Sequence, residues 1–250
     1  MLIDTHSHLN FEPFENDLDE VIGRCVGEDI WAINAGSQYE TSKKAVEIAE
    51  KNKTMFAGVG LHPIHARDDF NVEDFRNLAK SKKVVAIGEI GLDRYKDYGQ
   101  FINRQKEIFV QQLDLAKELN SPVIIHCRMA HQEMIEILAG YKLPGVIHCF
   151  TGTQEEAKKY LDMGFYLGIN GIMYKFDLKK VIGKTPLERI LIETDSPYLT
   201  PLPALSLAKE GRNEPIFVKY IGQEIAKIKN ISFEEVAIAT TQNAKNLFKI

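Results

Sequence analysis

The chain has 250 residues, of which 44% are hydrophobic and 26% charged, and its formal net charge is −4. This composition is typical of a globular protein, and no linker rich in Pro, Gly or Ser divides the chain, so we predict a single domain over residues 1–250. Proteins that read duplex DNA usually carry an excess of basic residues, and this chain does not. A nucleic-acid substrate would therefore have to be bound by metals and a few basic side chains at one site.

The cysteines and the apolar runs indicate a cellular location. Three cysteines, Cys25, Cys127 and Cys149, are too few for a disulfide framework and indicate a reducing compartment. No apolar run approaches the roughly 18 residues of a membrane span, and the N-terminus lacks the features of a signal peptide. We therefore expect a cytoplasmic protein with no membrane association and no obligate protein partner.

Eight short apolar runs predict parallel strands, and the gaps between them are long enough for one helix and two loops each. Between them, the segment 104–120 places Ile108, Phe109, Leu113 and Ala116 on one face of an amphipathic helix. Capping boxes at 153–156 and 232–235 predict two helix starts. The runs span residues 2–8, 30–34, 55–60, 84–89, 122–126, 145–148, 165–170 and 189–195.

This order of elements predicts a (β/α)8 TIM barrel, a fold that typically needs about 250 residues. A doubly wound open sheet is the alternative, but it would not gather side chains from the first, fourth, fifth, sixth and eighth strands around one centre. The barrel does so, because its active site lies where the carboxyl ends of all the strands meet.

Imidazoles and carboxylates close five of these strands, and this is the ligand set of a divalent-metal site. His6 and His8 are two residues apart, so they share a face and can bind one ion. Glu89 has two oxygens and can bridge two ions, for which Zn, Mn, Mg and Fe are candidates. Two such ions would share a hydroxide nucleophile and clamp an in-line displacement at phosphorus. The predicted metal ligands are His6, His8, Glu89, His126, His148 and Asp195.

Two residues are predicted to be catalytic. Asp195 can bind one ion and accept a proton from water, although a carboxylate so close to Pro197 could instead cap a helix. His62, after the third strand, could contact a phosphate or the developing charge, and His65 is a weaker candidate for the same role.

Other polar residues have supporting or structural predictions. Asp4 and Glu193 lie one step deeper than their neighbouring ligands and could orient them. His131 is expected on the solvated surface of a helix. Alternation along the strands is expected to turn Cys127 and Cys149 away from the histidines, toward the helices.

Positive charge and aromatic rings in the loops could hold a substrate. Arg128 and Arg94 could add positive charge to the site. Several aromatic residues in or near the loops that follow strands could stack on bases, although most such residues simply pack. They are Tyr95, Tyr98, Phe101, Phe150 and Tyr174.

Seven motifs in chain order resemble the TatD family of metal-dependent deoxyribonucleases, and the resemblance spans nearly the whole chain. It implies an amidohydrolase-type TIM barrel with two divalent metals, one held by His6, His8, Glu89 and Asp195 and the other by Glu89, His126 and His148. It also implies 3′-to-5′ exonuclease cleavage of DNA, with a link to DNA repair in some members. The last motif adds Arg212 as a candidate substrate contact. The motifs span Asp4–Leu9, Gly60–Pro63, Ile87–Asp93, His126–Arg128, His148–Gly152, Glu193–Tyr198 and Arg212–Pro215.

The chain departs from the family's pattern at three places, which affect substrate grip more than the metal centre. Met129 stands where an acidic residue is usual, and Asn170 stands where a serine is usual. Residues 204–211 are longer and less basic than the corresponding stretch of the family.

Three other functions compete with the nuclease. One is an amide or ester hydrolase of the same superfamily, but many of those carry a modified lysine where this chain has Glu89. Another is an aminoacyl-tRNA deacylase, an activity linked to some members of the family. The third is a non-catalytic binding barrel, which the intact ligands at all six positions argue against.

Overall fold

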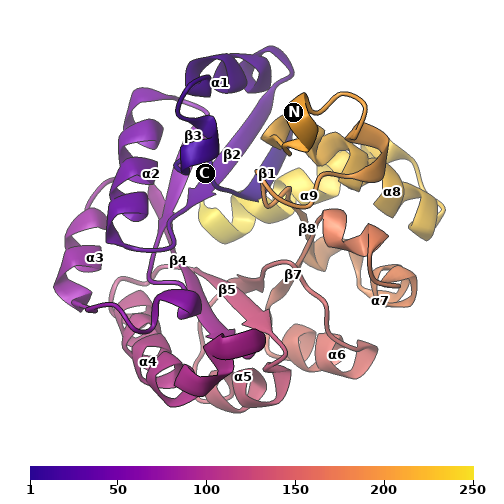
Figure 1. Ribbon diagram of the computed structural model, residues 1–250. Coiled ribbons are helices and arrows are strands. Elements are labelled where there is room, and N and C mark those ends of the chain that lie inside the picture. Colours follow the sequence, from indigo (N-terminus) through magenta and orange to yellow (C-terminus); the bar gives the residue numbers. More distant parts are fainter.

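The computed structural model describes residues 1–250 and confirms the predicted TIM barrel. Eight parallel strands form one sheet in the order β1 to β8, and the helices surround it (Figure 1). Each strand pairs with the next along the chain, with registers such as Leu2 opposite Ile30 and Gly91 opposite His126. The strands are β1 (Leu2–Ser7), β2 (Ile30–Ala35), β3 (Met55–Val59), β4 (Val84–Asp93), β5 (Val123–Arg128), β6 (Gly145–Ile147), β7 (Tyr166–Ile169) and β8 (Ile190–Ile192).

One α-helix follows each of the first seven strands, and two follow β8. The helix expected over 104–120 is α4, and the expected capping boxes begin α6 and α9, where Thr153 and Ser232 accept hydrogen bonds from the backbone of Glu156 and Glu235. No helix combines the length and the apolar character needed to span a membrane. The helices are α1 (Leu18–Gly27), α2 (Tyr39–Lys51), α3 (Val72–Leu78), α4 (Ile102–Glu118), α5 (His131–Leu138), α6 (Gln154–Asp162), α7 (Lys179–Lys184), α8 (Val218–Lys229) and α9 (Phe233–Phe248).

The barrel is nearly closed, and its last seam is an irregular one between β1 and the segment after β8. A single parallel bridge joins Ser7 to Ser196. The Asp195 N–H donates to His6 O at 2.9 Å, and the His8 N–H donates to Ser196 O at 2.8 Å. This seam joins the first strand to the segment that follows the last strand, and it lies beside the predicted ligands.

Five strands end earlier than the sequence predicts, and the differences at β6 and β8 concern predicted ligands. β6 ends at Ile147 and β8 ends at Ile192, so His148 and Asp195 lie in the first residues of loops. The physical reason at β8 is the Asp4 side chain, because its carboxylate accepts hydrogen bonds from both the N–H and the hydroxyl of Thr194. Thr194 is thereby bound to a side chain instead of a strand backbone.

The inside of the barrel has an apolar lower layer. Its side chains pack against Ala244, Leu247 and Phe248 of α9, which close that end of the barrel. A separate and larger apolar cluster lies between the strands and the surrounding helices. The lower layer consists of Ile3, Ile33, Val85, Ala86, Ile124, Val146 and Leu191.

A local irregularity in β1 sets which side chains face the site. Ile3 and His6 both face the inside, although uniform alternation would put them on opposite faces. The register of β1 against β2 shifts between Asp4 and Ser7, which accounts for the change of phase. A second shift, between Ile87 and Ile90 of β4, lies at Glu89.

Candidate metal centre

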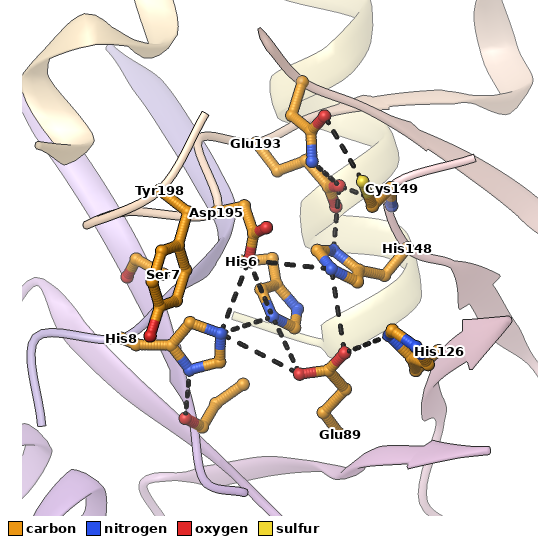
Figure 2. A network of polar contacts seen from close by, with 12 residues as sticks. His6, Ser7, His8, Glu89, His126, His148, Cys149, Glu193, Asp195 and Tyr198 are labelled. Carbon is orange, nitrogen blue, oxygen red and sulfur yellow. Dashed lines mark hydrogen bonds and ion pairs between the residues drawn. The ribbon is translucent and has the colours of Figure 1, made fainter. Parts of the chain in front are cut away.

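The six predicted ligands meet above the apolar layer, at the carboxyl end of the strands (Figure 2). His6 lies at the end of β1 and His8 directly after it, Glu89 comes from β4 and His126 from β5. His148 follows β6 directly, and Asp195 lies three residues after the end of β8. All are buried or half-buried, so their polar atoms must find partners within the site.

Four of these side chains form one close set. His6 Nε2 lies 3.1 Å from His8 Nε2 and 3.4 Å from Glu89 Oε2, and Asp195 Oδ1 lies 3.4 Å from His8 Nε2 and 3.8 Å from His6 Nε2. Ligands of a tetrahedral ion at about 2.0–2.1 Å would be about 3.3–3.4 Å apart. These four atoms therefore fit the corners of one cation site.

The other oxygen of Glu89 faces a second set of imidazoles. Glu89 Oε1 lies 2.9 Å from His126 Nδ1, 3.3 Å from His62 Nε2 and 3.7 Å from His148 Nε2. The two carboxylate oxygens thus point to different groups of histidines. This is the arrangement that a carboxylate shared by two cations requires.

Hydrogen-bond partners decide which ring nitrogen of each histidine has a free lone pair. His8 Nδ1 donates to the carbonyl of Ala35 at 2.8 Å, and His126 Nε2 donates to Asp93 Oδ2 at 3.0 Å. His148 Nδ1 lies 2.8 Å from Glu193 Oε1, as an ion-pair contact without the alignment of a hydrogen bond. In the neutral forms of His8 and His126 the lone pair is consequently on the nitrogen that faces Glu89 or Asp195.

His62 has the opposite arrangement. Its Nδ1 accepts a hydrogen bond from the Ile64 N–H at 3.2 Å, so the proton of the neutral ring is on Nε2. Burial lowers the pKa of His62 to about 4, which keeps the ring neutral. Although His62 lies close enough to Glu89 and His126 to complete a metal set, its Nε2 presents an N–H and not a lone pair. It suits a hydrogen-bond donor.

The charges of the site favour a cation. Burial by itself raises the pKa of Glu89, but His62, His6 and His126 outweigh it and hold the pKa well below its usual range. Burial lowers the pKa of His148, but Glu193, Asp195 and Glu89 outweigh it and raise the pKa to about 10. The neighbouring carboxylates therefore stabilise positive charge at the His148 ring. The donor set and its charge both fit divalent ions.

Supporting residues include two that the sequence pointed to only indirectly. Asp93 is buried at the end of β4, where its two oxygens bind His126 Nε2 and the Tyr95 N–H. Its spacing of four residues from Glu89 along one strand was the available signal. Asn170, an atypical residue for the family, donates to Glu193 Oε1 at 3.0 Å.

Glu193 and Asp4 hold the site in different ways. Glu193 is fully buried and binds Asn170, the Cys149 N–H at 2.7 Å and His148. Gly168 of β7 makes room for this carboxylate, because a Cβ there would lie 2.4 Å from Glu193 Oε2. Asp4 contacts no imidazole. It binds the His6 N–H and Thr194, so it orients the backbone and not a ligand ring.

Two predictions about neighbouring residues are wrong. Cys149 does not turn toward the helices, because β6 has already ended and the backbone φ of Cys149 is +46°, which breaks the alternation. Its thiol lies at the cavity beside Asn170. His131 is not on the surface but is buried at the start of α5, where its Nδ1 contacts Tyr160 and Cys127. Cys127 faces the helices, as expected.

A cavity of about 900 Å³ opens onto the ligands. Asp195, His62 and His65 line it together with His8, Glu89, His126 and His148, whereas His6 lies beneath it; His65 also pairs with Asp68 at 3.0 Å. Of the aromatic residues predicted to stack on bases, Tyr95 and Tyr98 line the cavity, whereas Phe101, Phe150 and Tyr174 do not. The remaining wall is largely apolar and includes Phe11, Ile64, Met129, Ile172, Phe176, Tyr198 and Leu199.

The three arginines proposed as substrate contacts are placed differently. Arg128 lines the cavity. Arg94 is outside it and forms an ion pair with Glu133. Arg212 is also outside it, where it binds Asp17 and Glu214 and stacks on Phe14. The structure therefore brings one of the three to the metal ligands.

Comparison with known proteins agrees with this geometry. The family model described as TatD related DNase matches residues 3–249. A protein of Bacillus subtilis described as the uncharacterized metal-dependent hydrolase YabD is 42% identical, with 100% of both chains covered. The 3'-5' ssDNA/RNA exonuclease TatD of Cronobacter sakazakii is 34% identical, with 99% of this chain and 97% of that protein covered.

A solved structure has the same fold over its full length. The crystal structure of YJJV, a TatD homologue from Escherichia coli, has a TM-score of 0.91 and 28% identity, and the match covers 100% of this chain and 98% of that one. The motifs, the barrel and the histidine–carboxylate cluster are thus found together in one fold. The chain belongs to the TatD family of metal-dependent hydrolases.

Proposed function

We propose that this protein is a 3′-to-5′ exonuclease that hydrolyses phosphodiester bonds at the ends of single-stranded DNA, with two divalent ions as cofactors. His6, His8, Glu89 and Asp195 would hold one ion, and Glu89, His126 and His148 the other. The observation that carries the proposal is Glu89, whose two oxygens face two separate groups of imidazoles. When bound, such a pair of ions supplies Lewis acidity and activates water at neutral pH.

Asp195 is the proposed proton acceptor. All its ion pairs with His6, His8 and His148 use Oδ1, which leaves Oδ2 for a proton from the attacking water. Asp195 has a backbone φ of +58°, so it is held at a sharp bend, and its N–H is bound to His6 O. This fixes the carboxylate beside the ligands of β1.

His62 is the proposed donor to a substrate oxygen. Its Nε2 lies at the cavity wall, 3.3 Å from Glu89 Oε1, and its buried, neutral ring can donate a hydrogen bond without a change of charge. A non-bridging phosphate oxygen at the ligands would be a suitable acceptor, because negative charge develops there during hydrolysis.

The cavity wall supports nucleic acid as the substrate class. Apolar and aromatic side chains at its rim remain exposed, with 54% exposure for Tyr198 and for Phe176 and 68% for Met129. Unpaired bases can stack on such side chains, whereas paired bases cannot reach them. The relative named as an exonuclease for single-stranded DNA and RNA supports the same choice.

The test is release of mononucleotides from single-stranded DNA labelled at its 5′ end, under Mg²⁺, Mn²⁺ and Zn²⁺ in turn. A ladder that shortens one nucleotide at a time from the 3′ end supports the proposal. Parallel reactions contain a simple ester, an amide and an aminoacyl-tRNA. Hydrolysis of one of these without any action on DNA would replace the exonuclease by that other activity.

A further inference from the structure

Arg128 is the cation of this cavity that no protein group neutralises. It follows His126 by two residues on β5 and lines the same cavity. Its side chain makes no hydrogen bond and no ion pair, although Glu89, Asp93 and Asp195 all line that cavity. Its charge is consequently available to a ligand.

Tyr95 holds this guanidinium in place. The Arg128 Cζ atom lies 3.6 Å from the centre of the Tyr95 ring, so one face of the guanidinium is stacked. Its edge, which carries the N–H donors, stays free, and that edge matches two oxygens of a phosphate. Stacking reduces the entropy lost when an arginine binds, because the side chain is already ordered.

The same carboxylate supports this stack and the metal ligands. Asp93 Oδ1 accepts the Tyr95 N–H at 2.7 Å, while Asp93 Oδ2 accepts His126 Nε2 at 3.0 Å. Arg128 and His126 are therefore held at a defined separation, two residues or about 6.6 Å along the strand. No carboxylate oxygen of the predicted metal ligands lies within ion-pair distance of Arg128. An anion bound by Arg128 would therefore lie beside these residues and not among them.

We propose that Arg128, stacked on Tyr95, forms a binding subsite for a second phosphate of the substrate, the one next to the phosphate that is cleaved. This inference rests on the proposed nuclease function. It predicts that a substrate needs two neighbouring phosphates for full affinity. It also accounts for an acidic chain that grips nucleic acid through one free arginine instead of a basic surface.

The test uses metal-loaded protein and short single-stranded oligonucleotides that cannot be cleaved, because a bridging methylene replaces the ester oxygen at the last linkage and keeps its charge. The adjacent linkage is either a normal phosphodiester or a neutral methylphosphonate. Fluorescence anisotropy gives the affinity of each ligand for the wild type, Arg128→Gln and Arg189→Gln. Arg128 is exposed, so glutamine there leaves the core untouched.

Arg189→Gln is the matched control. Arg189 also stacks on a tyrosine, Tyr166, but it precedes β8 at the opposite end of the barrel. It removes the same charge from the chain without touching the cavity.

We expect the neutral linkage to weaken binding about 10- to 100-fold in the wild type and in Arg189→Gln, as for loss of a charged hydrogen bond. In Arg128→Gln the two ligands should bind equally and weakly. An equal loss in all three proteins, or no loss in any, would overturn the subsite. Failure of the wild type to bind the charged ligand would overturn it as well.

The outcome is separable from that of the proposed function. If the linkage effect depends on Arg128 but no mononucleotide is released from normal DNA, the subsite stands and the exonuclease is wrong. If DNA is degraded but the effect is independent of Arg128, the exonuclease stands and the subsite is wrong.

Discussion

The lower and upper halves of the barrel interior differ completely in chemistry, although the same strands build both. Two residues along the chain separate Ile124 from His126, Val146 from His148 and Leu191 from Glu193. The lower layer is hydrocarbon packed on α9, and the upper layer is imidazole and carboxylate. The lower layer stabilises the fold. The upper layer brings together buried polar and charged groups, which need hydrogen bonds, opposite charges or metal ions as partners. A substitution should therefore affect either stability or chemistry, according to its layer.

The largest effect is expected from Glu89→Gln in the upper layer. The amide keeps the shape but removes the charge that both groups of imidazoles face, so the affinity for both ions should fall together. Loss of an outer partner of a ligand typically costs about 10- to 100-fold, and loss of the shared ligand should cost more. Elemental analysis and metal titration measure this. A titration in which one ion binds normally would show that Glu89 is not shared.

Asp195→Asn should come next. The remaining ligands His6, His8 and Glu89 can still hold an ion, but the proposed proton acceptor is gone. Loss of a general base typically lowers turnover by about 10²–10⁴-fold. Turnover is measured at metal concentrations shown to fill both sites. A near-normal rate under those conditions would mean that Asp195 acts only as a ligand and that the proton goes elsewhere.

Leu191→Ala tests the lower layer. Leu191 is fully buried inside the barrel, so the cavity and the lost contacts should destabilise the fold by about 2–5 kcal/mol. Metal stoichiometry and turnover of the folded fraction should not change. Urea unfolding, followed by metal analysis below the transition, measures both. A parallel loss of metal affinity would contradict the separation of the two layers.

The smallest effect is expected from Gly168→Ala, which acts through Glu193. The added methyl group would overlap Glu193 Oε2, so the carboxylate should shift away from His148. Affinity for the ion that His148 would hold should fall about 10- to 100-fold, and the other ion should be much less affected. Metal titration of the two sites measures the difference.

Two further variants keep this last prediction interpretable. Gly23→Ala in α1 has open space around the new methyl group and should leave both affinities unchanged. Glu193→Gln removes the charge without a clash and should reproduce the selective loss. If Gly168→Ala or Glu193→Gln lowered the affinity for both ions equally, the substitution would be disturbing the barrel in general.

Much of the fold and of the candidate site could be predicted because the signals are local. Eight apolar runs separated by amphipathic segments are read directly from the order of residues, and a parallel repeat of eight closes into a barrel. The residues that cluster at the candidate site could be predicted because a histidine or carboxylate at the end of a buried strand stands out against hydrocarbon. Motif resemblance added the family, which the comparisons confirm.

The details of each ligand required the tertiary structure, because the deciding partners are far away in the chain. The lone pair of His8 faces the site because Nδ1 is bound by Ala35 of another strand, and His62 differs because its partner is Ile64. Arg94 and Arg212 are neutralised by Glu133 and Asp17, which no local pattern connects to them.

The sequence by itself therefore determined the repeat, the barrel and the residues that meet at its carboxyl end, since these follow from hydrophobic periodicity and strand direction. Only the tertiary structure decided the phase of β1 at His6, the exposure of Cys149 to the cavity and the burial of His131. It also decided that Arg128 keeps its charge free. Hydrogen bonds and ion pairs act over a few ångströms in space, and the folded barrel alone determines which residues come that close.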